Sequence, residues 1–264
     1  MSRISITTLR KMKQEGEKIA CLTAYDASFT KILEAAGVEI LLVGDSLGMV
    51  VQGQDSTLPV SLEEMIYHTR LVSQASETAL IMADMPFMTY NDIAQALSNA
   101  GRLMKEGGAH MVKLEGGTPM LDIVQAMTDY GIPVCAHLGL QPQSVHKLGG
   151  YRQQGKDELS AKEILHDALA MESAGADMMV LESVPATLGK EITQALKIPV
   201  IGIGAGADCD SQVLVLYDIL GITPGKPPSF SRNFLQDTSS IQAAIEAFVR
   251  SVKDGSFPAA EHYS

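Results

Sequence analysis

The chain has 264 residues, of which 46% are hydrophobic, so it can bury a sizeable core and is not an intrinsically disordered protein. Its formal net charge of -11 disfavours nucleic acid and anionic membranes as partners. No stretch approaches the ~18 uninterrupted apolar residues of a membrane-spanning helix, and the first residues lack a secretory signal, so we expect a cytoplasmic protein.

Short apolar runs alternate with longer helical patterns along the whole chain, which predicts βαβ units and a parallel sheet. The near-continuous apolar character of these runs is typical of strands that are buried on both faces. Eight strands with intervening helices favour an α/β fold, a single (β/α)8 TIM barrel over residues 1–264, with an open doubly wound sheet as the alternative. The strands are expected near residues 19–24, 39–43, 79–83, 110–114, 133–137, 177–181, 199–203 and 217–221.

Two capping signals support the helix spacing. Ser61 precedes Glu64 by three residues, and Ser160 precedes Glu163 in the same way, so both serines are expected to begin helices with a capping box. The last helix carries one apolar stripe, which could pack on its own barrel or on a neighbouring subunit. This stripe consists of Ile241, Ala244, Ile245, Phe248, Val249 and Val252.

Two connections are long, from residue 44 to about 61 and from 139 to about 160. Long connections in compact domains are usually binding loops or lids. Both follow predicted strands, so we expect both at the C-terminal face of the barrel, where barrel active sites lie.

Four acids end apolar strand-like runs: Asp45, Asp84, Glu115 and Glu182. In a parallel barrel such carboxylates converge on one end, where they repel one another unless a positive charge lies among them. Mg²⁺ suits hard oxygen ligands of this kind and takes only a few carboxylates. The first three are therefore candidate metal ligands, although each Asp could instead cap the helix or turn that follows it.

Lys113 and Glu115 lie two residues apart in one strand and should both point into the barrel. A buried lysine needs a partner, which could be a substrate oxygen or simply a structural Lys–Glu pair. His137 ends the fifth strand and is either a hydrogen-bond donor to a substrate oxygen or a satisfied buried histidine. Glu182 is a candidate general base if burial raises its pKa, and otherwise an acid that binds backbone N–H groups.

Two other features carry weaker signals. Cys21, Cys135 and Cys209 are scattered without a C-x-x-C pair, so we expect reduced thiols and no zinc site. The glycine-rich segment 202–206 lacks the spacing of a dinucleotide loop, so a tight turn is the simpler interpretation.

Several motifs together resemble the ketopantoate hydroxymethyltransferase family of pantothenate biosynthesis, and the likeness runs from about residue 4 to 261. The motifs occur in order along the chain: VGDSLGM at 43–49, GQDSTLP at 53–59, DMPF at 84–87, VKLEGG at 112–117, PVCAHLGL at 133–140 and IGIGAG at 201–206.

The resemblance implies a barrel of the phosphoenolpyruvate/pyruvate-utilising type, assembled as a homodecamer. It implies hydroxymethyl transfer from 5,10-methylenetetrahydrofolate to 3-methyl-2-oxobutanoate, giving 2-dehydropantoate by Mg²⁺-assisted enolisation and aldol-type addition. By the same likeness Asp45, Asp84 and Glu115 match the metal positions. Asp45, Ser46, Asp84 and Lys113 match the oxoacid-binding positions, and Glu182 matches the proton acceptor.

Two other functions remain open from the sequence. A carbon–carbon lyase or phosphonopyruvate-type mutase on the same barrel would also bind Mg²⁺ and an oxoacid, but it would not need folate. The second alternative is a catalytically silent barrel that serves as a sensor or assembly scaffold. Such a protein has no physical reason to retain a cluster of acids that repel one another.

Overall fold

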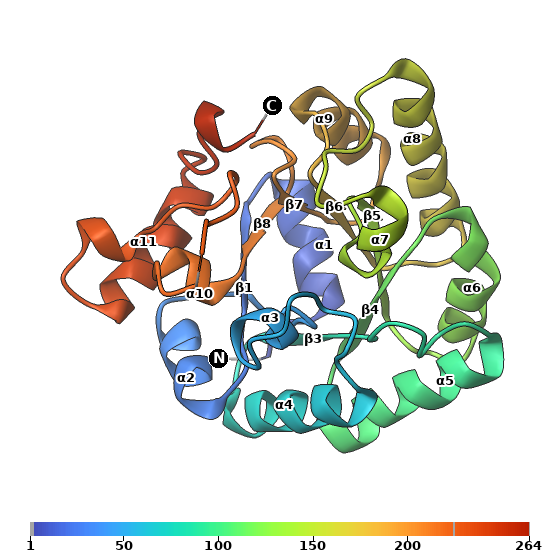
Figure 1. Ribbon diagram of the computed structural model, residues 1–264, viewed down its shortest axis with the longest axis horizontal. Helices are drawn as coiled ribbons and strands as arrows, with labels where there is room; N and C mark the ends of the chain where they lie inside the picture. Colours follow the sequence, from blue (N-terminus) through green and yellow to red (C-terminus); the bar gives the residue numbers. More distant parts are fainter. Residues whose placement is uncertain (1–2, 224, 264) are drawn as a thin grey trace.

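Eight parallel strands close into a barrel in the order in which they occur in the chain, which confirms the (β/α)8 barrel over the open sheet (Figure 1). The computed structural model describes residues 3–223 and 225–263, so the predicted domain limits at 1 and 264 lie outside the described residues. The strands are β1 (Ile19–Thr23), β2 (Ile40–Val43), β3 (Leu80–Asp84), β4 (Met111–Glu115), β5 (Val134–Gly139), β6 (Met178–Glu182), β7 (Val200–Ile203) and β8 (Ser211–Leu214).

Helices lie around the barrel and across its two ends (Figure 1). They are α1 (Ile6–Glu15), α2 (Ala27–Ala35), α3 (Leu47–Val50), α4 (Leu62–Ala75), α5 (Ile93–Arg102), α6 (Leu121–Asp129), α7 (Val145–Leu148), α8 (Glu158–Ser173), α9 (Ala186–Ala195), α10 (Leu216–Ile219) and α11 (Ile241–Lys253). Five further turns are η1 (Leu103–Gly107), η2 (Thr118–Met120), η3 (Pro142–Ser144), η4 (Leu235–Asp237) and η5 (Ala260–His262).

Side chains of the strands alternate between two apolar cores. Residues that point outward pack against the surrounding helices, and residues that point inward fill the barrel. In β4, for example, Met111 belongs to the inner core and Val112 to the outer one. Lys113 and Glu115 alternate with Val112 and share the face of Met111, so both point into the barrel, as predicted.

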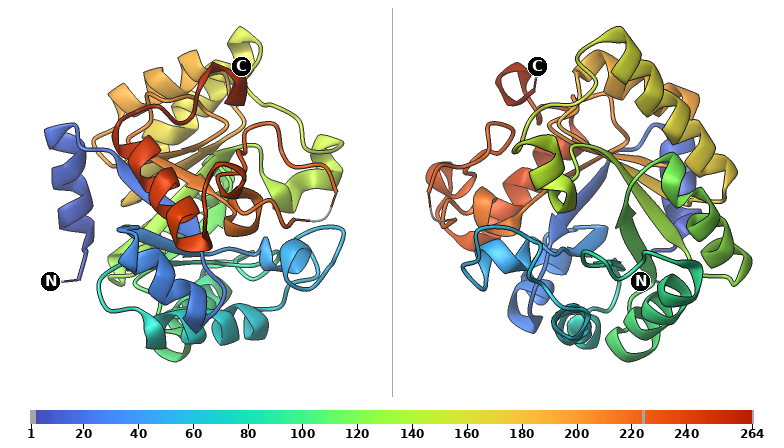
Figure 2. Two further views of the ribbon diagram at one scale, coloured as in Figure 1. Left: turned by 90° about the vertical axis from the view of Figure 1, so that its left-hand side faces the viewer. Right: turned by 45° about the vertical axis from the view of Figure 1, so that its right-hand side comes forward.

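Helix α1 closes the N-terminal end of the barrel. Its buried residues Leu9 and Met12 belong to the inner core together with Ile19 and Cys21. In the left panel of Figure 2, α1 lies at one end of the barrel and the segments with α3 and α7 lie at the other. The predicted site at the C-terminal strand ends is therefore on the side away from α1.

Replacing Leu9 by Ala should lower the free energy of unfolding by ~2–5 kcal/mol, because the change leaves a cavity where a fully buried side chain joins α1 to the barrel. Urea unfolding measures the effect. Thr7→Ala, on the exposed face of the same helix, is the control and should change stability by less than ~0.5 kcal/mol. Equal stabilities of the two variants would show that α1 contributes little to the barrel.

The predicted eighth strand at 217–221 is wrong. Strand β8 precedes it, and most of the predicted segment forms the short helix α10. The apolar pattern did not predict β8, because two of its four residues, Ser211 and Gln212, are polar although both are buried. The Gln212 amide donates to the Gly206 carbonyl at 2.9 Å, so the fold satisfies a polar strand residue that an apolar pattern cannot reveal.

One of the two predicted capping boxes is present. Ser61 begins α4 and exchanges hydrogen bonds with Glu64 as expected. The prediction at Ser160 is wrong, because Asp157 begins α8 three residues earlier and its carboxylate accepts the Ser160 N–H at 3.0 Å. Asp caps a helix as well as Ser does, so α8 can begin after Asp157.

The apolar stripe of α11 packs on its own barrel. Five of its six residues are buried within the protomer, and only Ile241, at the first turn, is 39% exposed. The five are Ala244, Ile245, Phe248, Val249 and Val252.

The two long connections lie at the C-terminal end of the barrel, as predicted. One contains α3, and the other contains η3 and α7. Figure 1, which looks toward this end, shows α3 and α7 lying across the mouth of the barrel. Among the described residues, none of the helices has the length and apolar character needed to cross a membrane.

Candidate active site

Four carboxylates gather at the C-terminal end of the strands. Asp84, Glu115 and Glu182 are the last residues of β3, β4 and β6, and Asp45 lies two residues beyond β2. Asp45, Asp84 and Glu115 are at most 6% exposed, and the Glu182 side chain is 12% exposed. The structure therefore places the four acids at one end of the barrel, as the sequence predicted.

Asp45 and Asp84 form a buried acid pair. The Asp45 backbone N–H donates to Asp84 Oδ2 at 3.0 Å, which holds the two residues together across β2 and β3. Burial, followed by the negative charge of Asp84, raises the pKa of Asp45 to about 7. Such a pair is electrostatically unfavourable unless a positive charge lies beside it.

Lys113 supplies one positive charge. Its Nζ lies 3.1 Å from Asp84 Oδ1, and the two residues are register partners on β3 and β4. Burial alone would lower the pKa of Lys113, but the carboxylates of Asp84, Glu115 and Asp45 outweigh it and raise that pKa above its ordinary value. The ammonium is thus retained inside the barrel, and its direct ion-pair partner is Asp84, not the Glu115 of its own strand.

His137 lies between Lys113 and Glu182. Its Nδ1 is 3.2 Å from Lys113 Nζ. Its Nε2 is 3.2 Å from Glu182 Oε2, although this contact lacks hydrogen-bond geometry. Burial, and then the charge of Lys113, lowers the pKa of His137 well below its ordinary value, so the ring is neutral. An ammonium can only donate, so Nδ1 accepts and the ring proton is assigned to Nε2, on the side of Glu182.

Glu182 has the properties of a base that works near neutral pH. Burial raises the pKa of its carboxyl to about 7, and the nearby Lys113 partly offsets this effect. A carboxylate with such a pKa is a far stronger base than an exposed glutamate.

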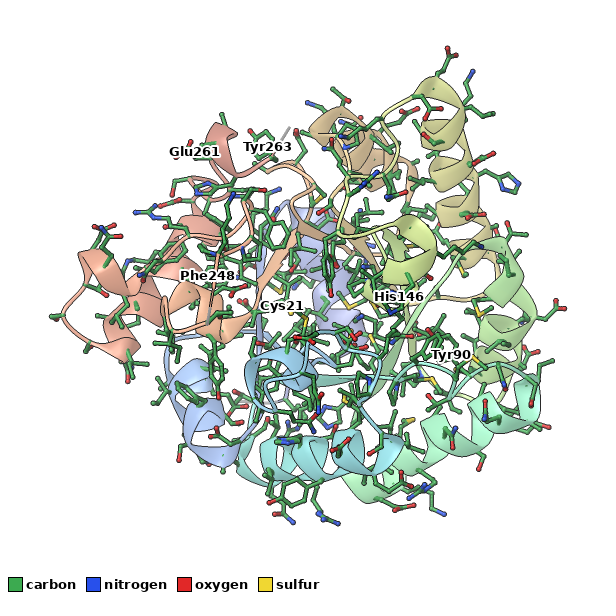
Figure 3. The ribbon with its side chains drawn as sticks, in the orientation of Figure 1. Cys21, Tyr90, His146, Phe248, Glu261 and Tyr263 are labelled. Atoms are coloured by element: carbon green, nitrogen blue, oxygen red, sulfur yellow. The ribbon has the colours of Figure 1, made fainter. Side chains whose placement is uncertain are left out.

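Two residues of this site carried no signal in the sequence. Gln143, in η3, contacts Asp45 and Glu115, and the Tyr90 hydroxyl donates to Gln143 Oε1. Tyr90 lies on the α5–α6 side of the barrel (Figure 3). Both residues come from connections without periodicity. The one available hint was that each connection directly follows a predicted strand.

Ser46 is placed beside the acids but faces a different group. Its Oγ lies 2.9 Å from the Tyr25 hydroxyl, and it precedes α3 in the first long connection. Its role in binding an oxoacid stays a prediction.

The acids fit a magnesium ion that is held by few protein ligands. Within residues 3–223 and 225–263, no group of three or more His, Cys, Asp or Glu side chains is arranged to hold a metal. Asp45 and Asp84 nevertheless offer hard carboxylate oxygens side by side, and Asp84 Oδ1 is buried without a hydrogen bond of good geometry, its neighbour being the Lys113 ammonium at 3.1 Å. Mg²⁺ commonly takes one or two carboxylates and keeps several waters, so this pair suits it without a third direct ligand. Glu115 as a metal ligand stays a prediction.

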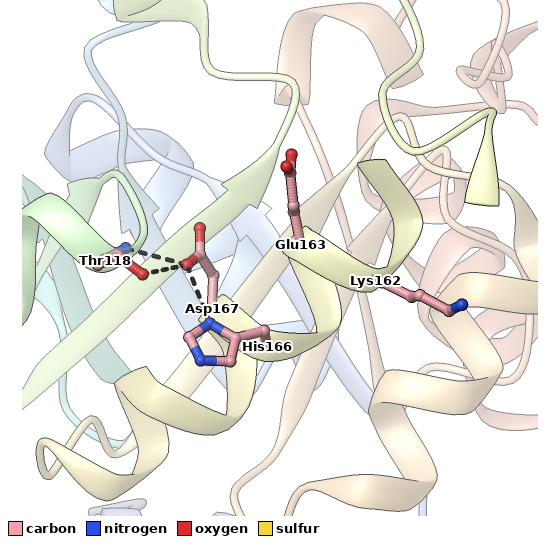
Figure 4. Close-up of a pocket in the computed structure, with 5 residues that line it drawn as sticks. All are labelled: Thr118, Lys162, Glu163, His166 and Asp167. Carbon is pink, nitrogen blue, oxygen red and sulfur yellow. Dashed lines mark hydrogen bonds and ion pairs between the residues drawn. The ribbon is translucent and has the colours of Figure 1, made fainter. Parts of the chain in front are cut away.

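Two further features do not belong to this site. A depression of about 420 Å³ lies between η2 and α8, where Asp167 Oδ1 accepts the Thr118 N–H at 3.1 Å (Figure 4). Its lining lacks the buried acids described above. In the glycine segment after β7, Gly206 has a φ of +91°, and a Cβ there would lie 2.7 Å from the Ala186 side chain. This close approach of α9 supports the tight-turn interpretation.

The closed barrel with acids at the C-terminal ends of its strands has the architecture of a (β/α)8-barrel enzyme, and its fold is similar to that of the phosphoenolpyruvate mutase/isocitrate lyase superfamily. Among solved structures with this fold, a 2,3-dimethylmalate lyase of that superfamily is 19% identical, with a TM-score of 0.59 and 82% of each chain covered. A phosphonopyruvate hydrolase is 15% identical, with a TM-score of 0.62, covering 99% of this chain and 93% of its own. At these identities the likeness concerns the fold.

The sequence comparisons identify the family. Residues 3–260 match the model of the ketopantoate hydroxymethyltransferase family, and the chain belongs to that family. A 3-methyl-2-oxobutanoate hydroxymethyltransferase of Nitrosococcus oceani is 63% identical over 261 residues, which are 99% of each chain. The enzyme of the same name from Alkalilimnicola ehrlichii is 57% identical over 98% of this chain and 94% of its own. The family resemblance drawn from the sequence motifs is confirmed.

Proposed function

We propose that this enzyme transfers a hydroxymethyl group from 5,10-methylenetetrahydrofolate to 3-methyl-2-oxobutanoate and forms 2-dehydropantoate in pantothenate biosynthesis. The observation that carries the proposal is the near full-length identity of 53–63% to relatives of this name. The buried acids, the lysine and the raised pKa of Glu182 supply the groups that an enolisation requires.

Asp45 and Asp84 would hold Mg²⁺, with Glu115 beside them. Bound there, the ion would act as a Lewis acid that polarises the keto group of the oxoacid. Lys113 is the one cation among the six residues Asp45, Asp84, Lys113, Glu115, His137 and Glu182, and it would stabilise negative charge on the substrate oxygens. Ser46 and His137 are further candidate contacts of the oxoacid.

Glu182 would take the proton from C3 of the oxoacid. Its carboxylate can do so near neutral pH because burial has raised its pKa to about 7. His137 Nε2 lies 3.2 Å from Glu182 Oε2, while the Lys113 ammonium keeps the other ring nitrogen as an acceptor. The three side chains would keep the base oriented toward the substrate.

The balanced reaction consumes one water molecule. The C3 carbanion forms the new bond to the methylene carbon, and the folate nitrogen leaves as the amine of tetrahydrofolate. Departure of that nitrogen alone provides no oxygen for the product hydroxyl, so water supplies it.

Turnover should require folate. With 3-methyl-2-oxobutanoate and Mg²⁺, the protein should release 2-dehydropantoate only when 5,10-methylenetetrahydrofolate is present, and mass spectrometry of the products measures this. Carbon–carbon cleavage or rearrangement of an oxoacid without folate would instead identify a lyase or mutase. Binding of the oxoacid without any turnover would identify a silent scaffold.

The assembly and partners belong to the same proposal. By family likeness the enzyme is a homo-oligomer, a decamer, that acts on small molecules in the cytoplasm. The net charge of -11 supports the absence of nucleic acid and anionic membranes among its partners.

A further inference from the structure

Gln143 connects three neighbouring strand ends. It is 6% exposed and lies in η3, within the long connection after β5. Its side-chain Nε2 donates to Asp45 Oδ2 at 2.9 Å and to the Met85 carbonyl at 3.0 Å. Its backbone N–H donates to Glu115 Oε2 at 3.0 Å. One residue thus contacts the segments that follow β2 and β3 and the last residue of β4.

The surroundings of Gln143 fix the orientation of its amide. The Met85 carbonyl can only accept a hydrogen bond, so the amide nitrogen must face it. The amide oxygen accepts from the Tyr90 hydroxyl, at 2.5 Å. The Tyr90 oxygen in turn accepts the Glu115 N–H at 3.3 Å, so its own proton is available for Gln143. Rotation of the amide by half a turn would place two acceptors against each other at Met85 and again at Asp45.

We infer that Gln143 is a positioning residue for Asp45, which it holds ready for the divalent ion and the oxoacid. The inference rests on the proposed function for the identity of those ligands. The side-chain nitrogen of Gln143 donates a hydrogen bond to Asp45 Oδ2. This bond fixes the rotation of the Asp45 carboxylate about its Cβ–Cγ bond. Groups that hydrogen-bond to a metal-binding carboxylate orient it in this way.

The same contacts make the orientation of Asp45 depend on the connection that carries η3 and α7. Asp45 and Gln143 are 98 positions apart in the chain, so their contact forms only when this connection lies against the barrel rim. The backbone bond to Glu115 anchors the connection independently of the Gln143 side chain. A side-chain substitution can therefore release Asp45 without removing that anchor.

Gln143→Met tests the inference, because Met keeps the length of the side chain and the backbone bond to Glu115 but cannot donate to Asp45. Titration of the substrate-free protein with Mn²⁺, followed by electron paramagnetic resonance, should show an affinity ~10–100-fold below the wild type. Gln154→Met is the matched control, since its amide donates to the Arg152 carbonyl in the same connection, and it should bind Mn²⁺ as the wild type does. In turnover assays, the metal concentration needed for half-maximal rate should rise in Gln143→Met by a factor similar to the loss of Mn²⁺ affinity.

A crystal structure of Gln143→Met provides a second readout that does not depend on metal. The Asp45 carboxylate should be rotated or displaced in it, and an unmoved carboxylate with unchanged Mn²⁺ affinity would overturn the inference.

Tyr90→Phe is the second variant if Gln143→Met does not fold. Loss of the donor to Gln143 Oε1 should weaken Mn²⁺ binding by a smaller factor, and unchanged Mn²⁺ affinity would again overturn the inference. Failure of the wild type to bind Mn²⁺ would contradict the proposed metal, and the position of Asp45 in the variant would still decide the role of Gln143.

Discussion

Glu182→Gln should lower kcat/KM by ~10²–10⁴, because the amide has the shape of the carboxyl but cannot accept the C3 proton. Exchange of deuterium from solvent into C3 of 3-methyl-2-oxobutanoate, measured by NMR without folate, should fall by a similar factor. Oxoacid binding, measured by calorimetry, should be much less affected. This combination would assign Glu182 to proton removal and not to binding.

Glu163→Gln is the control for this substitution, since Glu163 lies on the exposed face of α8 and should leave the exchange rate unchanged. Exchange at the wild-type rate in Glu182→Gln would show that another group is the base. The wild-type exchange rate should also rise with pH and level off above about 7. The sign follows from the chemistry: burial raises the pKa of Glu182 to about 7, and only the deprotonated form accepts a proton. A rate that does not change across this range would contradict the assignment.

Asp84→Asn should weaken Mg²⁺ and oxoacid binding together. Asp84 Oδ1 is 3.1 Å from Lys113, and Asp84 Oδ2 accepts the Asp45 N–H, so the substitution changes both the proposed metal pair and the lysine. The loss of Mg²⁺ affinity should exceed the ~10–100-fold that is typical when a residue around metal ligands is replaced. Calorimetric titration with Mg²⁺ and then with 3-methyl-2-oxobutanoate measures both affinities.

Asp122→Asn, on the exposed face of α6, removes the same charge far from these contacts and should bind both ligands as the wild type does. Unchanged titrations of Asp84→Asn with both ligands would refute Asp84 as a ligand. Loss of oxoacid binding with Mg²⁺ binding intact would assign Asp84 to the lysine alone.

Asp45 and Lys113 illustrate why part of the site was predictable. Acids at the ends of apolar runs can be read from the sequence, because parallel strands of a barrel all present their C-terminal ends on one side. The inward direction of Lys113 and Glu115 was also predictable, because side chains of a strand alternate with a period of two. These features depend on residues that are close together in the chain.

Gln143 and β8 illustrate what was not predictable. Gln143 lies in a connection whose path follows no period, and its contact with Asp45 spans 98 positions. Strand β8 contains Ser211 and Gln212, which are polar yet buried, so its sequence does not resemble a buried strand. In both cases a glutamine side chain is buried, and only the folded structure shows which groups accept its hydrogen bonds.

The sequence by itself determined the barrel, the end of it that carries the acids, and the family. The tertiary structure decided the partners: Lys113 pairs with Asp84 because β3 and β4 place them side by side, and His137 lies between Lys113 and Glu182 because β5 runs between β4 and β6. The physical reason is that periodicity and strand ends are local properties of the chain. Which charges neutralise each other depends on the register between strands and on the path of the loops, and only the folded molecule fixes these.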